Sequence, residues 1–185
     1  ITDIDNDGDL DVLSSSIGDG KIAWYENMNG QGVFGAQQII ATASIGGTTS
    51  YIEILASDLD GDSDNDVLFA ANGSPDEVIY WLENTNAQGA FGSPQVVLDV
   101  FGGMYNINSA DLDNDGDIDL YGDNTFDGVL YLKNDGLGNF TYEQNFPTSY
   151  DDYFGFSQAF DVDADNDLDI VAFVKNDNNT NEGAF

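Results

Sequence analysis

The chain has almost no positive charge: its 185 residues include only three Lys or Arg, and neither His nor Cys occurs. Without His and Cys it can form neither a Ser-His or Cys-His nucleophilic site nor a zinc site with the usual ligands. Nucleic-acid binding requires clustered Lys and Arg that displace counterions from phosphates, and the lysines here are dispersed. No apolar run of about 20 residues, the length of a membrane-spanning helix, is present. We therefore expect no enzyme of these types, no nucleic-acid partner and no membrane insertion.

Acidic residues are as abundant as basic residues are scarce. The sequence contains 35 Asp and Glu and has a formal net charge of -32. High acidity alone is typical of solvated or disordered chains. Here, twenty of the 35 acidic residues lie in four short segments, each followed by apolar residues, and 41% of the chain is hydrophobic. This distribution predicts a folded domain with a core and four acidic loops.

The four acidic segments are copies of one nine-residue pattern. They begin at Asp3, Asp58, Asp111 and Asp161, so successive copies start 55, 53 and 50 residues apart, and each has Asp at positions 1, 3, 5, 7 and 9. The candidate metal ligands are Asp3, Asp5, Asp7, Asp9, Asp11, Asp58, Asp60, Asp62, Asp64, Asp66, Asp111, Asp113, Asp115, Asp117, Asp119, Asp161, Asp163, Asp165, Asp167 and Asp169. A period of this length indicates an array of similar structural units.

The similarity extends beyond the loops. About 20 residues after each of the first three loop starts comes a strand-like segment ending in Asn, followed by a glycine-rich turn ending in Phe. The segments are residues 22–27, 79–84 and 130–134, and the turns end at Phe34, Phe91 and Phe140. In the fourth copy we interpret residues 174–176 and 183–185 as compressed versions of these two features.

Runs of β-branched and aromatic residues bounded by Gly, Asn and Asp predict about four strands in each repeat. Those before the loops are residues 51–57, 105–110 and 154–160, those after them are 67–71 and 170–174, and the last strands are 37–40, 95–98 and 142–146. Four strands per repeat is typical of propeller blades. We predict an all-β chain of about four four-stranded antiparallel blades, with all metal loops on one face.

The predicted repeats span approximately residues 1–50, 51–104, 105–153 and 154–185, and the first and last are incomplete. Residues 1–2 are short for a leading strand, and the chain stops after the last Gly-x-Phe turn. We therefore expect the whole chain to be a partial β-propeller, a fragment of a larger one.

Alternate aspartates in a tight loop favour calcium. Ca²⁺ takes six to eight oxygen ligands, and carboxylates at alternate positions can turn inward on one ion. Position 6 must turn sharply with a positive φ, which suits Gly8 and Gly116, is tolerated by Asn166 and suits Ser63 less well. We expect about one Ca²⁺ per repeat, up to four. The alternatives are a solvated acidic turn without metal, and Mg²⁺, which prefers few protein carboxylates and keeps its waters.

Similar loops occur in EF-hands and dockerins, where a helix follows the loop and position 12 is Glu. None of the four copies has Glu at that position. The residues after at least two of the loops have the character of strands, which favours a β-turn loop over an EF-hand.

These motifs together resemble the FG-GAP/VCBS repeat, the repeat of integrin α-subunit propellers and of many bacterial secreted proteins. The resemblance rests on the aspartate loop, the apolar strand, the Trp-x-Glu-Asn or Tyr-Leu-Lys-Asn segment and the Gly-x-Phe turn, and it covers essentially the whole chain. It implies a β-propeller with one calcium per blade, in the turn between the first and second strands. It also implies that positions 1, 3, 5 and 9 supply side chains and position 7 a carbonyl. Ser63 and Asn166, in place of Gly, depart from the pattern.

We expect a non-catalytic, calcium-stabilised scaffold or adhesion module of a secreted or cell-surface protein. Its expected partners are an extracellular protein, a polysaccharide or sister subunits. One alternative is a carbohydrate-binding propeller, a lectin or the accessory domain of a polysaccharide-degrading enzyme, in which Trp24, Trp81, Tyr25, Tyr80 and Tyr131 stack on sugars. Another is a catalytic propeller such as a polysaccharide lyase. Aromatic residues of this kind more often pack between blades, and burial of Trp24 and Trp81 would weigh against the lectin.

Overall fold

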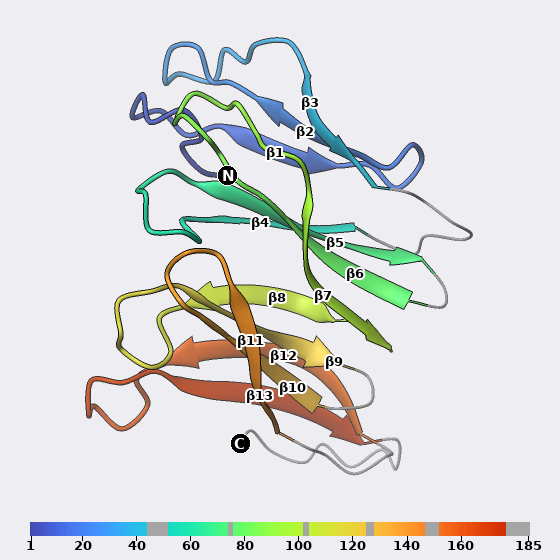
Figure 1. The fold of residues 1–185 in the computed structure, drawn as a ribbon, viewed down its shortest axis with the longest axis vertical. Helices are drawn as coiled ribbons and strands as arrows, with labels where there is room; N and C mark the ends of the chain where they lie inside the picture. The colour runs from blue at the N-terminus through green and yellow to red at the C-terminus, as the bar shows by residue number, and fades with distance from the viewer. Residues whose placement is uncertain (44–51, 74–75, 102–103, 125–127, 147–151, 177–185) are drawn as a thin grey trace. The chain divides into compact units, whose positions relative to one another are not determined.

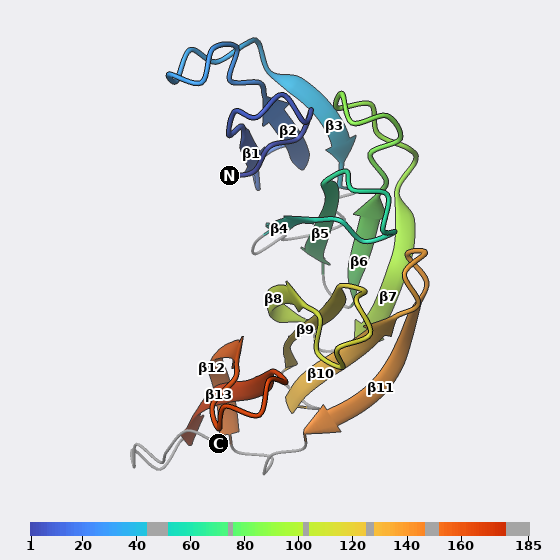
Figure 2. The ribbon, with the colours of Figure 1, turned by 90° about the vertical axis from the view of Figure 1, so that its left-hand side faces the viewer.

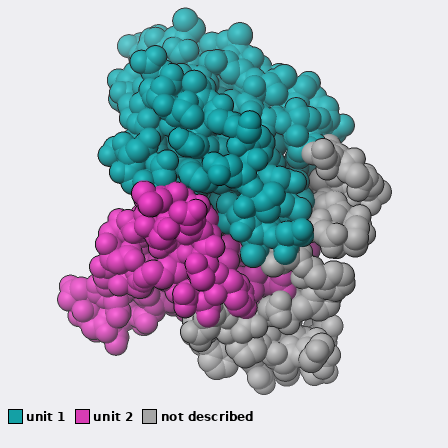
Figure 3. Space-filling model, in the orientation of Figure 1, with its two compact units in different colours: residues 1–101 teal, residues 102–185 magenta. Residues whose placement is uncertain are grey.

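The computed structural model describes residues 1–43, 52–73, 76–101, 104–124, 128–146 and 152–176 (Figure 1). Every regular element within these ranges is a β-strand, which confirms the predicted all-β class. The chain divides into two compact units, residues 1–101 and residues 102–185, which Figure 3 colours separately. Each unit contains two sheets.

Unit 1 contains a three-stranded and a four-stranded antiparallel sheet, each built from strands that follow one another in the chain (Figure 2). The first consists of β1 (Val12–Ser15), β2 (Lys21–Tyr25) and β3 (Gln38–Thr42), and the second of β4 (Ile52–Ser57), β5 (Asp66–Gly73), β6 (Asp76–Leu82) and β7 (Gln95–Phe101). Thr2 pairs with Asp11 across the first acidic loop, as Ser57 of β4 pairs with Asp66 across the second. The first sheet therefore keeps one residue pair of a leading strand.

Unit 2 repeats this arrangement. Its four-stranded sheet has the order β11-β10-β9-β8, and its second sheet is the antiparallel pair β12-β13. The strands are β8 (Tyr105–Ala110), β9 (Asp119–Asn124), β10 (Gly128–Asn134), β11 (Phe140–Phe146), β12 (Asp152–Phe160) and β13 (Asp169–Asn176). Propeller blades are antiparallel sheets in which each strand neighbours the next in the chain, and these sheets have that order, as predicted.

The two sheets of unit 1 share an apolar core. Ile22 and Trp24 of β2 belong to one cluster of buried side chains with Ile52 of β4 and Phe69 of β5. Phe69 also stacks on Tyr80 of β6 with 5.0 Å between ring centroids. Because each sheet covers one face of the other, these strands are rich in β-branched and aromatic residues.

The two sheets of unit 2 also meet through polar groups. The hydroxyl oxygen of Tyr121 accepts a hydrogen bond from the backbone N–H of Ala159 at 2.9 Å, which joins β9 to β12. Within the four-stranded sheet itself, Asp123 on β9 is only 2% exposed and accepts a hydrogen bond from the side chain of Asn106 on β8 at 2.8 Å. A carboxylate is thus buried in this unit, where desolvation raises its pKa.

The structure corrects our interpretation of the fourth repeat. Residues 174–176 are not a compressed copy of the Trp-containing strand, because they lie at the end of β13, the strand that directly follows the loop. The interpretation rested on a shared Lys-Asn pair, which ends both β10 and β13 although the two strands occupy different places in their repeats. Tyr51 and residues 183–185 lie outside the described residues.

Candidate metal centre

All four acidic loops share two hydrogen bonds that run from backbone N–H groups to aspartate side chains. The carboxylate at position 1 accepts a hydrogen bond from the N–H at position 6, and the carboxylate at position 5 accepts one from the N–H at position 7. The first set measures 3.0, 3.0, 3.1 and 3.2 Å in loops one to four. The second measures 2.8, 2.9, 3.1 and 3.1 Å. Aspartate favours such local turns because its side chain reaches nearby N–H groups.

Two positions in each loop require a left-handed backbone. Position 6 has a positive φ in every copy: 93° at Gly8, 75° at Ser63, 98° at Gly116 and 75° at Asn166. The turn predicted at position 6 is therefore present even where Ser replaces Gly. Position 4 also has a positive φ, which the sequence did not lead us to expect. It is occupied by Asn6, Gly61, Asn114 and, at 65°, Ala164.

The turns bring carboxylates together. In each loop three aspartates offer oxygen atoms within 4.8 Å of one another. The groups are Asp3, Asp5 and Asp11; Asp58, Asp60 and Asp62; Asp111, Asp113 and Asp115; and Asp161, Asp163 and Asp165. Positions 1 and 3 thus meet in all four loops, with position 5 in three of them and position 9 in the first.

The donor set fits a hard cation. Every clustered group is a carboxylate, the ligand that Ca²⁺ prefers. Oδ1 of Asp3, of Asp5 and of Asp111 is buried and accepts no hydrogen bond from any described residue. A buried, unpartnered carboxylate oxygen beside other carboxylates is costly unless a cation neutralises it.

Position 7 is different: Asp9, Asp64, Asp117 and Asp167 belong to none of the carboxylate groups found among the described residues. Two of them turn toward glycine in the turn after the third strand. A Cβ added to Gly30 would lie 2.2 Å from Asp9 Oδ1, and one on Gly136 would lie 2.5 Å from Asp117 Oδ1. The resemblance assigns the carbonyl of position 7 to the ion, and side chains turned this way are compatible with that assignment.

Position 9 ties the loop to its sheet. Its Oδ2 accepts the N–H of position 2 at 3.0 Å in the first loop and 3.1 Å in the other three. In the first three repeats its Oδ1 also accepts, at 2.8 Å, the N–H of Asn27, Asn84 or Asn134 at the end of the third strand. The sequence analysis missed these asparagines as site residues, although an Asn follows position 9 by 16, 18 and 15 residues.

Burial and crowding oppose the ionised state of these carboxyls. Burial raises the pKa of Asp66 to about 6, and it also raises the pKa of Asp119. Burial, followed by the charges of neighbouring aspartates, raises the pKa of Asp5 and of Asp60. A bound cation reverses this balance, since it favours the charged form of every carboxylate around it.

Neighbouring loops contact each other within each unit. In unit 1, Asn6 Nδ2 donates to Asp64 Oδ1 at 2.9 Å, and Asn65 Nδ2 donates to the carbonyl of Asp3 at 2.8 Å. In unit 2, Asn114 Nδ2 donates to the carbonyl of Asn166 at 3.2 Å. The two loops of each unit therefore lie at the same end of their sheets (Figure 1), as predicted for neighbouring blades.

The tryptophans pack inside. Trp24 and Trp81 are 2% and 5% exposed, and they occupy equivalent places, opposite Leu13 and Leu68 of the preceding strand. Gly89, in the turn of the second repeat, lies directly on the Trp24 ring: an added Cβ would be 2.1 Å from it. The prediction that both indoles are buried is confirmed.

Together, the blades and their aspartate loops define a repeat protein of the propeller class. Residues 3–69 and residues 58–122 each match the FG-GAP-like repeat, and the two matches together cover more than half of the chain. The chain belongs to the FG-GAP-like repeat family, as the resemblance in its motifs indicated. The repeats of this family are generally non-catalytic modules and are typical of extracellular domains.

The comparison with curated proteins finds no match for the chain. Within the part of the chain that the structure describes, no helix has the length and apolar character needed to span a bilayer.

Proposed function

We propose that the chain is a calcium-binding, non-catalytic scaffold or adhesion module of a secreted or cell-surface protein. One observation carries the proposal: four loops that share two hydrogen bonds each bring oxygen atoms of three carboxylates within 4.8 Å of one another. In each loop the side chains at positions 1, 3, 5 and 9 and the carbonyl at position 7 are the candidate ligands. When bound, Ca²⁺ would supply the positive charge that lets these oxygens lie close together.

Calcium would act as a structural component of each blade. The aspartate loop joins a blade's first two strands, and in the first three repeats its position 9 accepts a hydrogen bond from the asparagine at the end of the third strand. A ligand that binds only the folded state stabilises it by about 2.7 kcal/mol at a hundredfold excess over Kd. Typical domains are stable by about 5–15 kcal/mol, so two occupied sites would contribute a large share.

The partner we propose is an extracellular protein, a polysaccharide or a sister subunit. The burial of Trp24 and Trp81 weighs against the lectin alternative, because neither indole is open to a sugar ring. The high negative charge suits a protein held together by divalent cations in a calcium-rich medium outside the cell. Extracellular calcium modules commonly bind with Kd of about 10⁻⁴–10⁻³ M.

Calcium titration calorimetry, with metal analysis of the dialysed protein, tests the proposal. We expect up to four Ca²⁺ per chain, weak binding of Mg²⁺, and a sharp fall of the melting temperature in excess chelator that Ca²⁺ reverses. An unchanged melting curve in protein shown to be metal-free would contradict a structural role for calcium.

A further inference from the structure

One residue beside the loops changes sign between repeats. The residue before the tethering asparagine is Glu26 in the first repeat, Glu83 in the second and Lys133 in the third. The N–H of the following asparagine bonds position 9 of its loop at 2.8 Å in all three repeats. The three residues are therefore equivalent in structure as well as in sequence.

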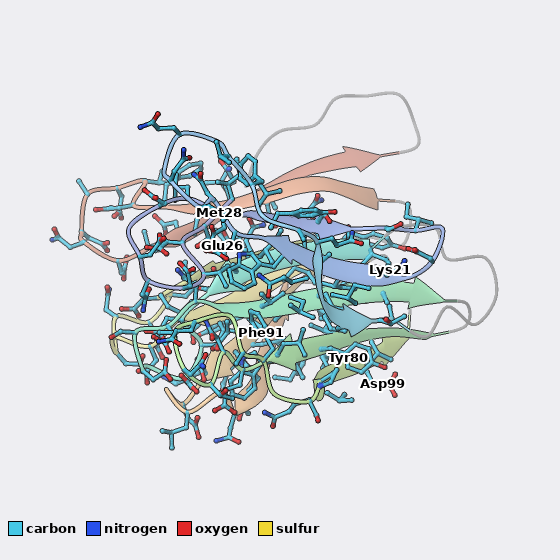
Figure 4. The ribbon with its side chains drawn as sticks, turned by 90° about the horizontal axis from the view of Figure 1, so that it is seen from above. Lys21, Glu26, Met28, Tyr80, Phe91 and Asp99 are labelled. Carbon is cyan, nitrogen blue, oxygen red and sulfur yellow. The ribbon has the colours of Figure 1, made fainter. Side chains whose placement is uncertain are left out.

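In the first two repeats this residue adds negative charge to the site. Glu26 lies at the loop end of β2, opposite the end that carries Lys21 (Figure 4). Its charge is one of the smaller causes that raise the pKa of Asp5, after burial and the nearby aspartates. Glu83 acts on Asp60 in the same way. Both glutamates thus make the site more negative, which favours binding of a cation.

In the third repeat the same position supplies a cation. Lys133 Nζ donates hydrogen bonds to Asp113 Oδ2 and, at 2.9 Å, to Asp115 Oδ2. These are the carboxylates of positions 3 and 5, and both belong to the group that would hold calcium. The hydrogen bond from the Lys133 ammonium lowers the pKa of Asp115.

We propose that Lys133 is an internal counter-ion that lowers the calcium affinity of the third loop and holds that loop closed without metal. The inference rests on the proposed function, because it concerns the same sites. Calcium at the third loop must displace the ammonium from two of its ligands, and the net charge of the site is two units less negative than that of its counterparts with Glu. Affinity in such loops depends on the number of charged ligands. The first two sites therefore fill first, and the third fills at higher calcium.

Lys133→Glu and Glu83→Lys test the proposal in opposite directions. We expect Lys133→Glu to raise the affinity of the weaker class of sites at least tenfold in calcium titration calorimetry, and Lys133→Met to give an intermediate value. Glu83→Lys should move one site from the tighter class to the weaker. In excess chelator, Lys133→Glu should melt below the wild type, because the empty loop has lost its cation.

Lys21→Glu is the matched control. It makes the same change in net charge, but Lys21 pairs at 2.6 Å with Asp19 at the far end of β2. If Lys133→Glu and Lys21→Glu have the same calcium affinity and the same melting point in chelator, the role of Lys133 is refuted while calcium binding stands. If the wild type binds no Ca²⁺ at all, both proposals fail.

Discussion

The loops of unit 1 and unit 2 share one backbone but differ in their surroundings. In unit 1, the position 9 carboxylates Asp11 and Asp66 are 1% and 0% exposed, and each accepts two backbone N–H groups. In unit 2, Asp119 is equally buried, but Asp169 is exposed and, among the described residues, accepts the N–H of Val162. The nine-residue pattern sets the turn, and the neighbouring strand decides how well the turn is anchored.

The contacts between adjacent loops show the same contrast. Three side-chain amides join the first two repeats: Asn6 and Asn65 link loop to loop, and Asn84 Nδ2 donates to the carbonyl of Ile4 at 2.8 Å. Among the described residues of unit 2, the bond between the third and fourth loops is that of Asn114, at 3.2 Å. We therefore expect a substitution in one loop of unit 1 to reduce stability more than the equivalent change in unit 2, and to affect both loops of unit 1.

Replacing the position 9 carboxylate gives the largest expected contrast. Asp66→Asn replaces one of the two carboxylate oxygens with an NH₂ group, so one of the two buried N–H groups loses its acceptor. Since hydrogen bonds to charged groups contribute about 1.5–3 kcal/mol, the loss should be about 2–3 kcal/mol. Asp169→Asn, at an exposed position with one N–H, should cost clearly less. Urea unfolding in saturating calcium measures both, and equal losses would contradict the difference in anchoring.

Asp123 of unit 2 allows a test of pH dependence at a buried carboxyl outside the acidic loops, because burial raises its pKa. A carboxyl whose pKa is higher in the folded state than in the unfolded state binds more protons when folded, between the two values. The contribution of Asp123 to the free energy of unfolding therefore falls as pH rises above about 4, and this loss persists at pH 7. Asp123→Asn keeps an acceptor for Asn106, so it should stabilise the protein at pH 7 and flatten the profile. Urea unfolding of both proteins across a pH series measures this difference. Parallel plots of unfolding free energy against pH for variant and wild type would refute the expectation.

Position 4 tests backbone strain. Ala164 in the fourth loop has a φ of 65°, whereas Gly61 takes this position in the second loop with a φ of 76°. A left-handed backbone costs an L-residue roughly 1–2 kcal/mol, so Ala164→Gly should gain about 1 kcal/mol and Gly61→Ala should lose a similar amount. Thermal melts at fixed calcium measure both changes. If both variants destabilise, the difference between the loops does not lie in the backbone.

The smallest expected effect concerns coupling between sites. Asn65 binds the carbonyl of Asp3, a residue of the first carboxylate group. Asn65→Ala removes one neutral hydrogen bond, worth about 0.5–1.5 kcal/mol, and should weaken calcium binding at both loops of unit 1 by roughly two- to tenfold. Asn114→Ala is the matching change in unit 2 and should have less effect. Calorimetry that shows a change in one loop of unit 1 alone would argue against coupling.

Local chemistry explains which features could be predicted. The strand over residues 105–110, the positive φ at position 6 and the burial of both tryptophans follow from residue type and spacing, and the structure has all three. The strand predicted over residues 170–174 is present as β13, but its last residues were assigned to a separate strand, because a Lys-Asn pair fits the end of either strand. The contact of Lys133 with Asp113 and Asp115 depends on where β10 ends relative to a loop some 20 residues earlier. The residue pattern of one sequence does not determine how far the Lys133 ammonium lies from these two carboxylates.

The contact of Gly89 with Trp24 has a consequence for how such an array can change. The turn of one repeat covers the indole of the repeat before it, with no room for a side chain. The unit that can be duplicated, deleted or exchanged without exposing that indole is therefore one sheet plus the following repeat's turn, not one sheet alone. A swap that ignores this boundary should be visible as a red shift of Trp24 fluorescence, since the indole becomes wet. Gly89 thus meets two requirements at once: a left-handed backbone with a φ of 72°, and close contact with the tryptophan of the neighbouring repeat.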